Sequence, residues 1–379
     1  MPTTPTTEGL EDVVAGTTAI CTVDGVNGRL IYRGYDIRDL GEHASFEEVM
    51  HLLWSGDLPS RSELDALNTE LRASRSLPQP ILKRMQEYPK QALPLHVLRT
   101  VVSSAALEDP EVEDMSPAAS HRKAIRLTNL CAATVAAWER VRKGKEVVQP
   151  DSQLSHAANF LYMLTGSRPS DVFERTMDMA LTLHADHEFN ASTFAARVTA
   201  ATLSDMHSAI TSAVGALKGP LHGGANEGVI TMLQAIGSLE RTEDYVLQAL
   251  REKKRIMGFG HRVYRVEDPR AVFLRRMSRQ LGEQSGDLRW YEMSEKVREV
   301  VKREKGLEVN VDFYSASTYY TMGIPTDLFT SIFAVSRVVG WTAHVMEQYA
   351  HNRLIRPRGD YIGPTDRKWV PIEQRQKAA

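Results

Sequence analysis

Two glycine-rich breaks interrupt otherwise helical sequence, and each carries one histidine. The first, residues 218–226, reads Lys-Gly-Pro-Leu-His-Gly-Gly-Ala-Asn, and Asn226 with Glu227 then opens a helix. A histidine just before a helix N-terminus, such as His222, feels the positive end of the helix dipole, which favours the neutral imidazole. A neutral imidazole can donate an N–H to an oxygen that becomes negative during a reaction. His222 is therefore a candidate catalytic residue; the alternative is a loop histidine whose glycines serve only the turn.

The second break, residues 257–261, reads Met-Gly-Phe-Gly-His and is surrounded by cations. Gly258 and Gly260 can expose backbone N–H and C=O groups to a ligand that approaches closely. The nearby cations are Lys253, Lys254, Arg255, Arg262 and Arg265. Such a run is usually a solvated helix face, but cations around an exposed turn also suit a polyphosphate ligand. The spacing is neither that of a GxGxxG nucleotide turn nor that of a Walker loop.

One carboxylate and two arginines stand out for their surroundings. Asp312 has apolar neighbours, and desolvation would make its carboxylate a stronger base; the alternative is a helix N-cap aspartate. Arg337 is alone in an apolar helix (332–345) and needs an anion, from the protein or from a ligand. Arg356 lies in the basic segment 352–358.

The segment His184-Ala185-Asp186-His187-Glu188 has some features of a metal site. Two histidines at i and i+3 can share one helix face. The sequence has no HExxH pattern here and no obvious third ligand. No metal site is therefore expected.

The elements that position these residues are expected to be helices. The only strand-like pattern is a hairpin, 19–23 with 30–32, around the turn residues Asp24-Gly25 and Asn27-Gly28. Ser116-Pro117 is a predicted N-cap followed by an N1 proline, for a helix that ends at Lys143-Gly144. Other helical patterns cover 46–54, 62–77 (with a Ser62 cap), 153–165, 169–186, 192–216, 227–237, 243–253, 269–284, 289–304 and 327–351. Without βαβ units, the sequence predicts an all-α fold with one small β-hairpin.

Composition limits the class of protein. The 379 residues suggest about two domains. The net charge of -2 gives no general attraction to nucleic acid or acidic membranes. Only Cys21 and Cys131 are present, so neither a disulfide framework nor a CxxC metal knuckle is expected.

Nothing in the sequence predicts export or membrane insertion. Residues 1–7 lack the basic and apolar regions of a signal peptide. The most apolar stretch, 328–345, is interrupted by Arg337 and His344 and falls short of the ~20 apolar residues of a membrane span. The expected compartment is the cytoplasm.

Five separate segments together resemble the signature segments of citrate synthase. They are Leu217 to Asn226, Met257 to Tyr264, Asp268 to Arg270, Asn310 to Asp312 and Arg353 to Arg358. The resemblance runs from about Gly9 to about Glu373 and is closest to short bacterial enzymes of the Gram-positive type. No counterpart of the long N-terminal β domain of the NADH-inhibited hexamers is expected, so that regulation is not implied.

The resemblance implies roles for these residues in joining acetyl-CoA to oxaloacetate in the tricarboxylic acid cycle. Asp312 would take a methyl proton while His222 hydrogen-bonds the thioester oxygen, and His261 would protonate the ketone. Oxaloacetate would be held by His187, Arg270, Arg337 and, from the partner of a homodimer, Arg356. CoA would be bound by Arg255, Met257, Gly258, Phe259, Gly260, Arg262 and Arg265. No cofactor and no metal is implied.

The resemblance also implies two helical domains. The large domain would comprise residues 1–221 and 318–379, and the small domain 222–317, which closes over the site. Three other functions remain open. A 2-methylcitrate synthase would use propionyl-CoA, a CoA-dependent lyase would run the reaction backwards, and a non-catalytic helical scaffold would bind metal through His184 and His187.

Overall fold

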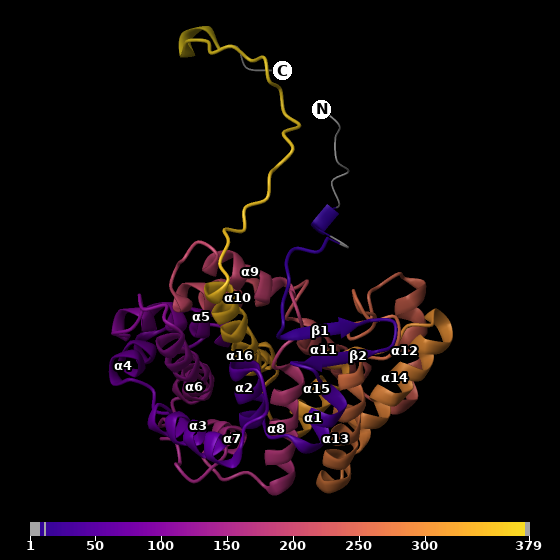
Figure 1. The fold of residues 1–379 in the computed structure, drawn as a ribbon. Helices are drawn as coiled ribbons and strands as arrows, with labels where there is room; N and C mark the ends of the chain where they lie inside the picture. The colour runs from indigo at the N-terminus through magenta and orange to yellow at the C-terminus, as the bar shows by residue number, and fades with distance from the viewer. Residues whose placement is uncertain (1–7, 11–12, 376–379) are drawn as a thin grey trace.

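A computed structural model describes residues 8–10 and 13–375, and it is mostly helical (Figure 1). The segment 1–7, on which the expectation of no signal peptide rests, lies outside the described residues. The predicted all-α class is confirmed, with a small sheet as the β component.

The predicted hairpin is present, with one strand more than expected. Strand β1 (Cys21–Asp24) pairs antiparallel with β2 (Arg29–Tyr32), and β2 pairs with β3 (Tyr35–Asp36). The turn is closed by Asp24, whose Oδ1 accepts from the backbone N–H groups of Val26 and Asn27 at 3.1 and 2.9 Å. A two-residue strand is too short to show alternation, so β3 was not predicted.

Most helices precede the first glycine-rich break. They are α1 (Ile37–His43), α2 (Phe46–Ser55), α3 (Arg61–Ala73), α4 (Gln79–Glu87), α5 (Pro94–Ala105), α6 (Pro117–Arg142), α7 (His156–Thr165), α8 (Asp171–His184), α9 (Ala191–Ala200) and α10 (Met206–Leu217). Ser116 caps α6 by accepting from Ala119 N–H, as predicted. Single 3₁₀ turns cover Glu8–Leu10, Ala106–Glu108, Thr326–Leu328 and Ile372–Gln374.

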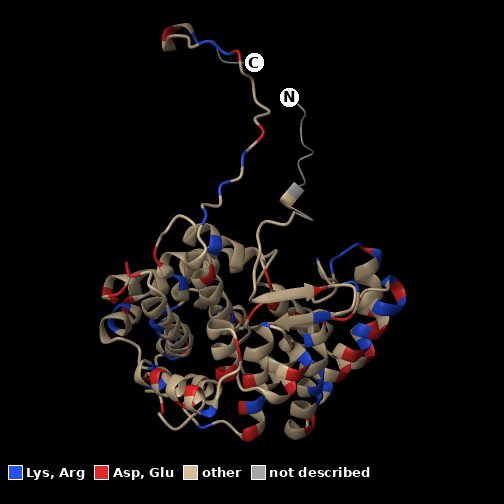
Figure 2. Ribbon diagram, viewed as in Figure 1, with Lys and Arg blue, Asp and Glu red and all other residues tan. Residues whose placement is uncertain are grey.

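Between the two breaks and after them lie α11 (Ala225–Ile236), α12 (Leu239–Arg251), α13 (Pro269–Ser285), α14 (Arg289–Lys305) and α15 (Val311–Thr321). In Figure 1, α12, α13 and α14 form one side of the molecule, and α3, α4 and α6 lie on the opposite side. Figure 2 shows many charged residues along α12 and α14, as expected of outer helices.

Helix α16 (Phe329–Ala350) is the central element of the core. It packs against α6, α9, α10, α2 and α8, and it is buried on nearly all sides. By length and composition, residues 326–350 could cross a membrane, but the whole apolar window is buried inside the protein, as in a core helix. Beyond α16, residues 351–375 run away from the body as an extended tail (Figure 1).

Several predicted helix boundaries are wrong, among them the start of α12, which lies at Leu239 and not at residue 243. The single pattern at 192–216 is two helices, because the chain turns at 201–205, where Leu203 has φ 62° and Asp205 caps α10. The helix predicted from Ser62 begins at Arg61, with Ser60 as its cap, and ends at Ala73. Ser60 and Glu63 form a reciprocal capping box there, which satisfies two backbone donors at once.

Candidate active site

His222 lies in the loop between α10 and α11, and its proton position is set by the backbone. Ser192 N–H lies 3.3 Å from Nε2 of His222, and Ser192 Oγ lies 2.8 Å from the same nitrogen. A backbone N–H can only donate, so Nε2 accepts and the proton of the neutral ring is on Nδ1. Burial, followed by the charge of Arg337, lowers the pKa of His222 to about 4. The neutral form was predicted, but burial rather than the helix dipole is its main cause.

His261 has the opposite tautomer. Its Nδ1 accepts from the backbone N–H groups of Val263 and Tyr264 at 3.0 and 3.1 Å, which leaves the proton on Nε2. Burial and the nearby Arg270 lower the pKa of His261 to about 4. Its ring centroid lies 5.1 Å from that of His187, and burial holds the pKa of His187 well below its usual value. The two breaks in the sequence therefore present two neutral imidazoles with opposite tautomers.

Asp312 is the second residue of α15, and it is not the N-cap. Asn310 occupies that position, and its side chain accepts from the Asp312 N–H at 3.1 Å. The N-cap alternative for Asp312 is therefore wrong, and its carboxylate is left for other partners. Burial raises the pKa of Asp312 to about 6, against the lowering effect of Arg270.

The second glycine-rich break positions the start of α15. Gly260 N–H donates to Glu308 C=O at 2.9 Å, and Asn310 N–H donates to Gly258 C=O at 3.0 Å. The Asn310 side chain also donates to Gly260 C=O at 3.0 Å. The Gly258 C=O and both backbone groups of Gly260 were predicted to face a ligand, but they form hydrogen bonds within the protein. These bonds align the residues just before Asp312.

Two of the predicted arginines are buried, with different partners. Arg270 forms a two-point pair with Asp268, at 2.9 and 2.7 Å. Arg337 donates its Nε–H to His184 C=O at 2.6 Å and stacks 4.6 Å from the Phe333 ring centroid. Among the described residues, no carboxylate lies within ion-pair distance of Arg337. A buried guanidinium of this kind is suited to an anionic ligand.

Comparison with known proteins shows the family of this chain. Residues 9–358 match the family described as "Citrate synthase, C-terminal domain". The chain belongs to the citrate synthase family. Citrate synthase 2 of Bacillus subtilis is 52% identical over 97% of this chain and 99% of its own length. The citrate synthase of Haloferax volcanii is also 52% identical, over 97% of this chain and 98% of its own.

A solved structure and a second kind of relative extend the comparison. The solved structure of citrate synthase from Thermoplasma acidophilum is a ternary complex with carboxymethyl coenzyme A and oxaloacetate. It has a TM-score of 0.93 at 33% identity, and the match covers 98% of this chain and 100% of that one. The 2-methylcitrate synthase of Shewanella oneidensis is 44% identical over 97% of this chain and 97% of its own length. The relatives thus include proteins named citrate synthase and proteins named 2-methylcitrate synthase.

The remaining predicted site residues differ in how far they are buried. Arg255, Arg262 and Arg265 are exposed, and Arg265 N–H donates to Gly25 C=O at 2.8 Å, next to the β1–β2 turn. Met257 is partly buried and Phe259 is buried. Arg356 is exposed in the tail that leaves the body in Figure 1.

The His184 and His187 pair does not form a metal site in the described part of the chain. No group of three or more His, Cys, Asp or Glu residues there could hold a metal ion. The His184 ring turns back into its own helix, with Nδ1 2.7 Å from Ala180 C=O.

Sequence reasoning missed two residues that orient the candidate catalytic residue His222. Ser192 bonds His222, and Trp341 Nε1–H donates to Ser192 Oγ at 3.1 Å. Both lie in ordinary helical patterns, so no spacing or composition signal could have found them.

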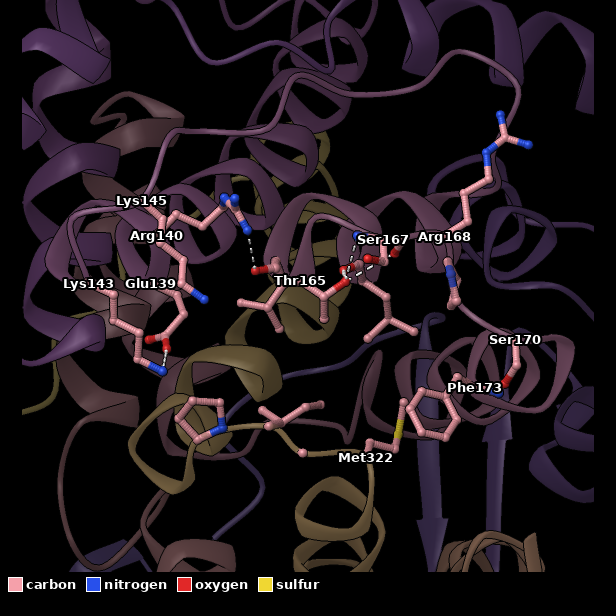
Figure 3. A pocket seen from close by; sticks show the side chains of 16 residues that line it. Glu139, Arg140, Lys143, Lys145, Thr165, Ser167, Arg168, Ser170, Phe173 and Met322 are labelled. Atoms are coloured by element: carbon pink, nitrogen blue, oxygen red, sulfur yellow. Dashed lines mark hydrogen bonds and ion pairs between the residues drawn. The ribbon is translucent and has the colours of Figure 1, made fainter. Parts of the chain in front are cut away.

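A cavity of about 490 Å³ lies away from this site (Figure 3). It is formed by the ends of α6 and α7, the start of α8 and the connection at 322–325. None of its lining residues belongs to the predicted site.

Proposed function

We propose that this chain condenses acetyl-CoA with oxaloacetate and water to give citrate and CoA. The observation that carries the proposal is the pair of opposite tautomers. His222 has a donor at Nδ1 and His261 has a donor at Nε2. The carboxylate of Asp312, with its raised pKa, feels the charge of Arg337 as His222 does and that of Arg270 as His261 does. The condensation needs one base and two separate donors, one for each carbonyl oxygen.

In the first step, Asp312 takes a proton from the methyl group of acetyl-CoA. A thioester methyl is a weak carbon acid, so the negative charge that develops on the carbonyl oxygen needs a donor. His222 Nδ1–H supplies it, and such donors are worth about 3–4 kcal/mol in comparable oxyanion sites. The pKa of about 6 makes Asp312 a stronger base than an exposed carboxylate and leaves it mostly ionised at neutral pH.

In the second step, the enol carbon bonds to the ketone carbon of oxaloacetate. The ketone oxygen takes the proton from His261 Nε2 and becomes the hydroxyl of the citryl thioester. The methyl proton held by Asp312 then replaces the one that His261 gave up, which restores both groups. Water then cleaves the thioester, and the sulfur leaves as CoA. His261 is neutral in the resting protein because burial and Arg270 disfavour its charged form, so its Nε2–H can polarise the ketone.

Oxaloacetate is held through its two carboxylates. Arg337 is suited to this role because it is buried without an ion-pair partner among the described residues. His187 and Arg270 lie beside His261, as the ring contact and the charge effects on His261 indicate. Arg356 completes the site from the partner subunit of a homodimer.

The CoA side of the site comprises Met257 to Gly260, with Arg255, Arg262 and Arg265 near the phosphates. The chain divides into a large domain, 1–221 with 318–379, and a small domain, 222–317. Asp312 then lies on the small domain and Arg337 on the large one, so domain closure assembles the site and excludes water. The enzyme acts in the cytoplasm, in the tricarboxylic acid cycle, and needs no cofactor.

The test is an assay of CoA release with oxaloacetate and either acetyl-CoA or propionyl-CoA. We expect a larger kcat/KM with acetyl-CoA. A larger kcat/KM with propionyl-CoA would establish the alternative function, that of a 2-methylcitrate synthase. The observation behind this alternative is the similarity to the 2-methylcitrate synthase of Shewanella oneidensis. One methylene in a pocket is worth only about 1–3 kcal/mol, so both substrates should be measured. Citrate cleavage without condensation would indicate the reverse lyase.

A further inference from the structure

A series of hydrogen-bonded polar residues leads from Asp186, next to His187, to Glu347. Asp186 and His344 are both fully buried, and Asp186 Oδ2 lies 3.2 Å from His344 Nε2. On the other side of the ring, His344 Nδ1 lies 3.1 Å from Arg197 Nη1. Arg197 donates in turn to Glu347 Oε2 at 2.6 Å. None of these residues touches the substrates in the proposed mechanism.

The direction of each hydrogen bond in this series follows from Arg197. A guanidinium can only donate, so His344 Nδ1 accepts and the ring proton is on Nε2. His344 Nε2–H therefore donates to the carboxylate of Asp186. Burying a carboxylate costs free energy unless it is hydrogen-bonded, and His344 provides that bond.

Asp186 belongs to a turn that accepts hydrogen bonds from three residues on one face of helix α16. Arg337 Nε–H donates to His184 C=O, Gly340 N–H donates to Ala185 C=O at 3.1 Å, and His344 donates to Asp186. The spacings, three and four residues, place these groups on one side of the helix. A Cβ at Gly340 would lie 2.3 Å from Ala185 O and 2.5 Å from Asp186 Oδ1, so the contact needs glycine.

The same turn carries His187, directly after Asp186. From the opposite side, Tyr32 on β2 donates its hydroxyl to Asp186 C=O at 2.8 Å, and Asp186 N–H donates to that hydroxyl at 3.1 Å. The turn therefore connects the buried carboxylate of Asp186 to two side chains of the proposed oxaloacetate site. His187 follows Asp186 in the sequence, and Arg337 donates to His184 C=O in the same turn.

We propose that His344 is a positioning residue for oxaloacetate: through Asp186 it holds the 184–188 turn so that His187 and Arg337 meet the substrate in the correct geometry. The inference rests on the proposed function of the site. It implies that the loss of the His344 hydrogen bonds weakens oxaloacetate binding, while acetyl-CoA binding and the proton transfer at Asp312 are spared. Small misplacements of binding groups are enough to change affinity by roughly tenfold or more.

The test compares His344→Leu with His344→Gln. Leucine is apolar and breaks both bonds. Glutamine can accept from Arg197 through its oxygen and donate to Asp186 through its nitrogen, as the ring does. We expect the leucine variant to raise the KM for oxaloacetate by roughly tenfold with the KM for acetyl-CoA unchanged, and the glutamine variant to stay within about twofold of the wild type. Oxaloacetate should also raise the Tm of the leucine variant less than that of the wild type.

A merely structural role predicts a different pattern. His344→Leu would then lower the Tm without ligand, but the folded enzyme would keep its KM for oxaloacetate, and this result would overturn the proposal. An equal loss of affinity in His344→Leu and His344→Gln would overturn it as well. If the leucine variant does not fold, His344→Met, which is unbranched and also lacks an N–H donor, takes its place under the same criteria. A wild-type protein that releases no CoA from acetyl-CoA and oxaloacetate would contradict the proposed function itself, which is a separate outcome.

Discussion

The backbone N–H of Ser192 lies 3.3 Å from Nε2 of His222 and directs that nitrogen to accept. The neutral ring consequently presents its Nδ1–H, and Trp341, which donates to Ser192 Oγ, supports the same arrangement. His222 can then donate to an oxyanion but cannot take a proton at Nδ1. A separate base is required, and Asp312 is the partly buried carboxylate that fits this role.

Replacing that base should remove turnover and spare oxaloacetate binding. Asp312→Asn keeps the shape of the side chain but cannot accept the methyl proton, so kcat should fall to less than about a tenth of the wild-type value. The exchange of acetyl-CoA methyl protons should be lost in parallel, while the Tm shift caused by oxaloacetate stays as in the wild type. His222→Ala should behave in the same way, whereas His261→Ala should damage both binding and turnover. Retained methyl-proton exchange in Asp312→Asn would contradict the assignment.

The pH dependence should report Asp312. Burial raises the pKa of this carboxyl to about 6, and only the ionised form can act as a base. At saturating oxaloacetate, kcat/KM for acetyl-CoA should therefore be constant above pH about 6. Below that pH it should decrease by about tenfold per pH unit. His222 and His261 are neutral throughout this range, because burial lowers the pKa of each to about 4. A level profile down to pH about 5 would exclude Asp312 as the base.

The two glycines of the second break should differ in their tolerance of a methyl group. Both have a positive φ, 81° at Gly258 and 73° at Gly260, so an alanine costs about 1–2 kcal/mol at either position. At Gly258 the new Cβ would also lie 2.7 Å from Phe313 and 2.8 Å from Val229, whereas at Gly260 nothing lies within 4 Å. Gly258→Ala should therefore lower the free energy of unfolding by about 1–3 kcal/mol more than Gly260→Ala.

The activity of the same two variants provides a second measurement. Because Phe313 directly follows Asp312, the shift forced by Gly258→Ala should also lower kcat, and Gly260→Ala should not. Equal kcat values in the two folded variants would show that the contact with Phe313 does not position the base.

The sequence predicted the helical class and the catalytic candidates because both depend on local signals. Hydrophobic periodicity gave most helices, and the glycine-rich breaks marked His222 and His261. The tautomers were not predictable, since they depend on Ser192 and on backbone groups that only the fold brings to the rings. The break at 201–205 was missed because its residues read as part of one continuous amphipathic pattern.

The basic residues near the second glycine-rich break should affect the binding of acetyl-CoA and not that of oxaloacetate. If Arg265 neutralises CoA phosphates, Arg265→Ala should raise the KM for acetyl-CoA and make it less dependent on salt. The affinity for oxaloacetate, measured without CoA, should hardly change. Arg279→Ala is the matched control, because Arg279 is an exposed arginine paired with Glu283 on α13. An equal effect of both variants, or an equal weakening of both substrates, would mean that the cluster is a solvated surface.

Arg356 should act in trans, because a single chain does not bring it to the site. It lies in the exposed tail beyond α16, which extends away from the body in Figure 1 and exposes Leu354, Tyr361 and Trp369. Apolar side chains on such a tail are suited to contact with a second copy of the chain. The first measurement is therefore the molecular mass in solution, and a monomer would exclude an action in trans.

The decisive experiment mixes two inactive variants, Arg356→Ala and His261→Ala, and lets the subunits exchange. With Arg356 in trans, a mixed dimer has one site with both lesions and one intact site, so activity should return. It should reach roughly a quarter of the wild-type rate, because about half of the dimers are mixed and each has one intact site of two. With Arg356 in cis, every site keeps one lesion and the mixture stays inactive. The control mixture contains Arg367→Ala in place of Arg356→Ala, together with His261→Ala. Arg367 is an exposed tail arginine outside the predicted site, so Arg367→Ala should be active before mixing.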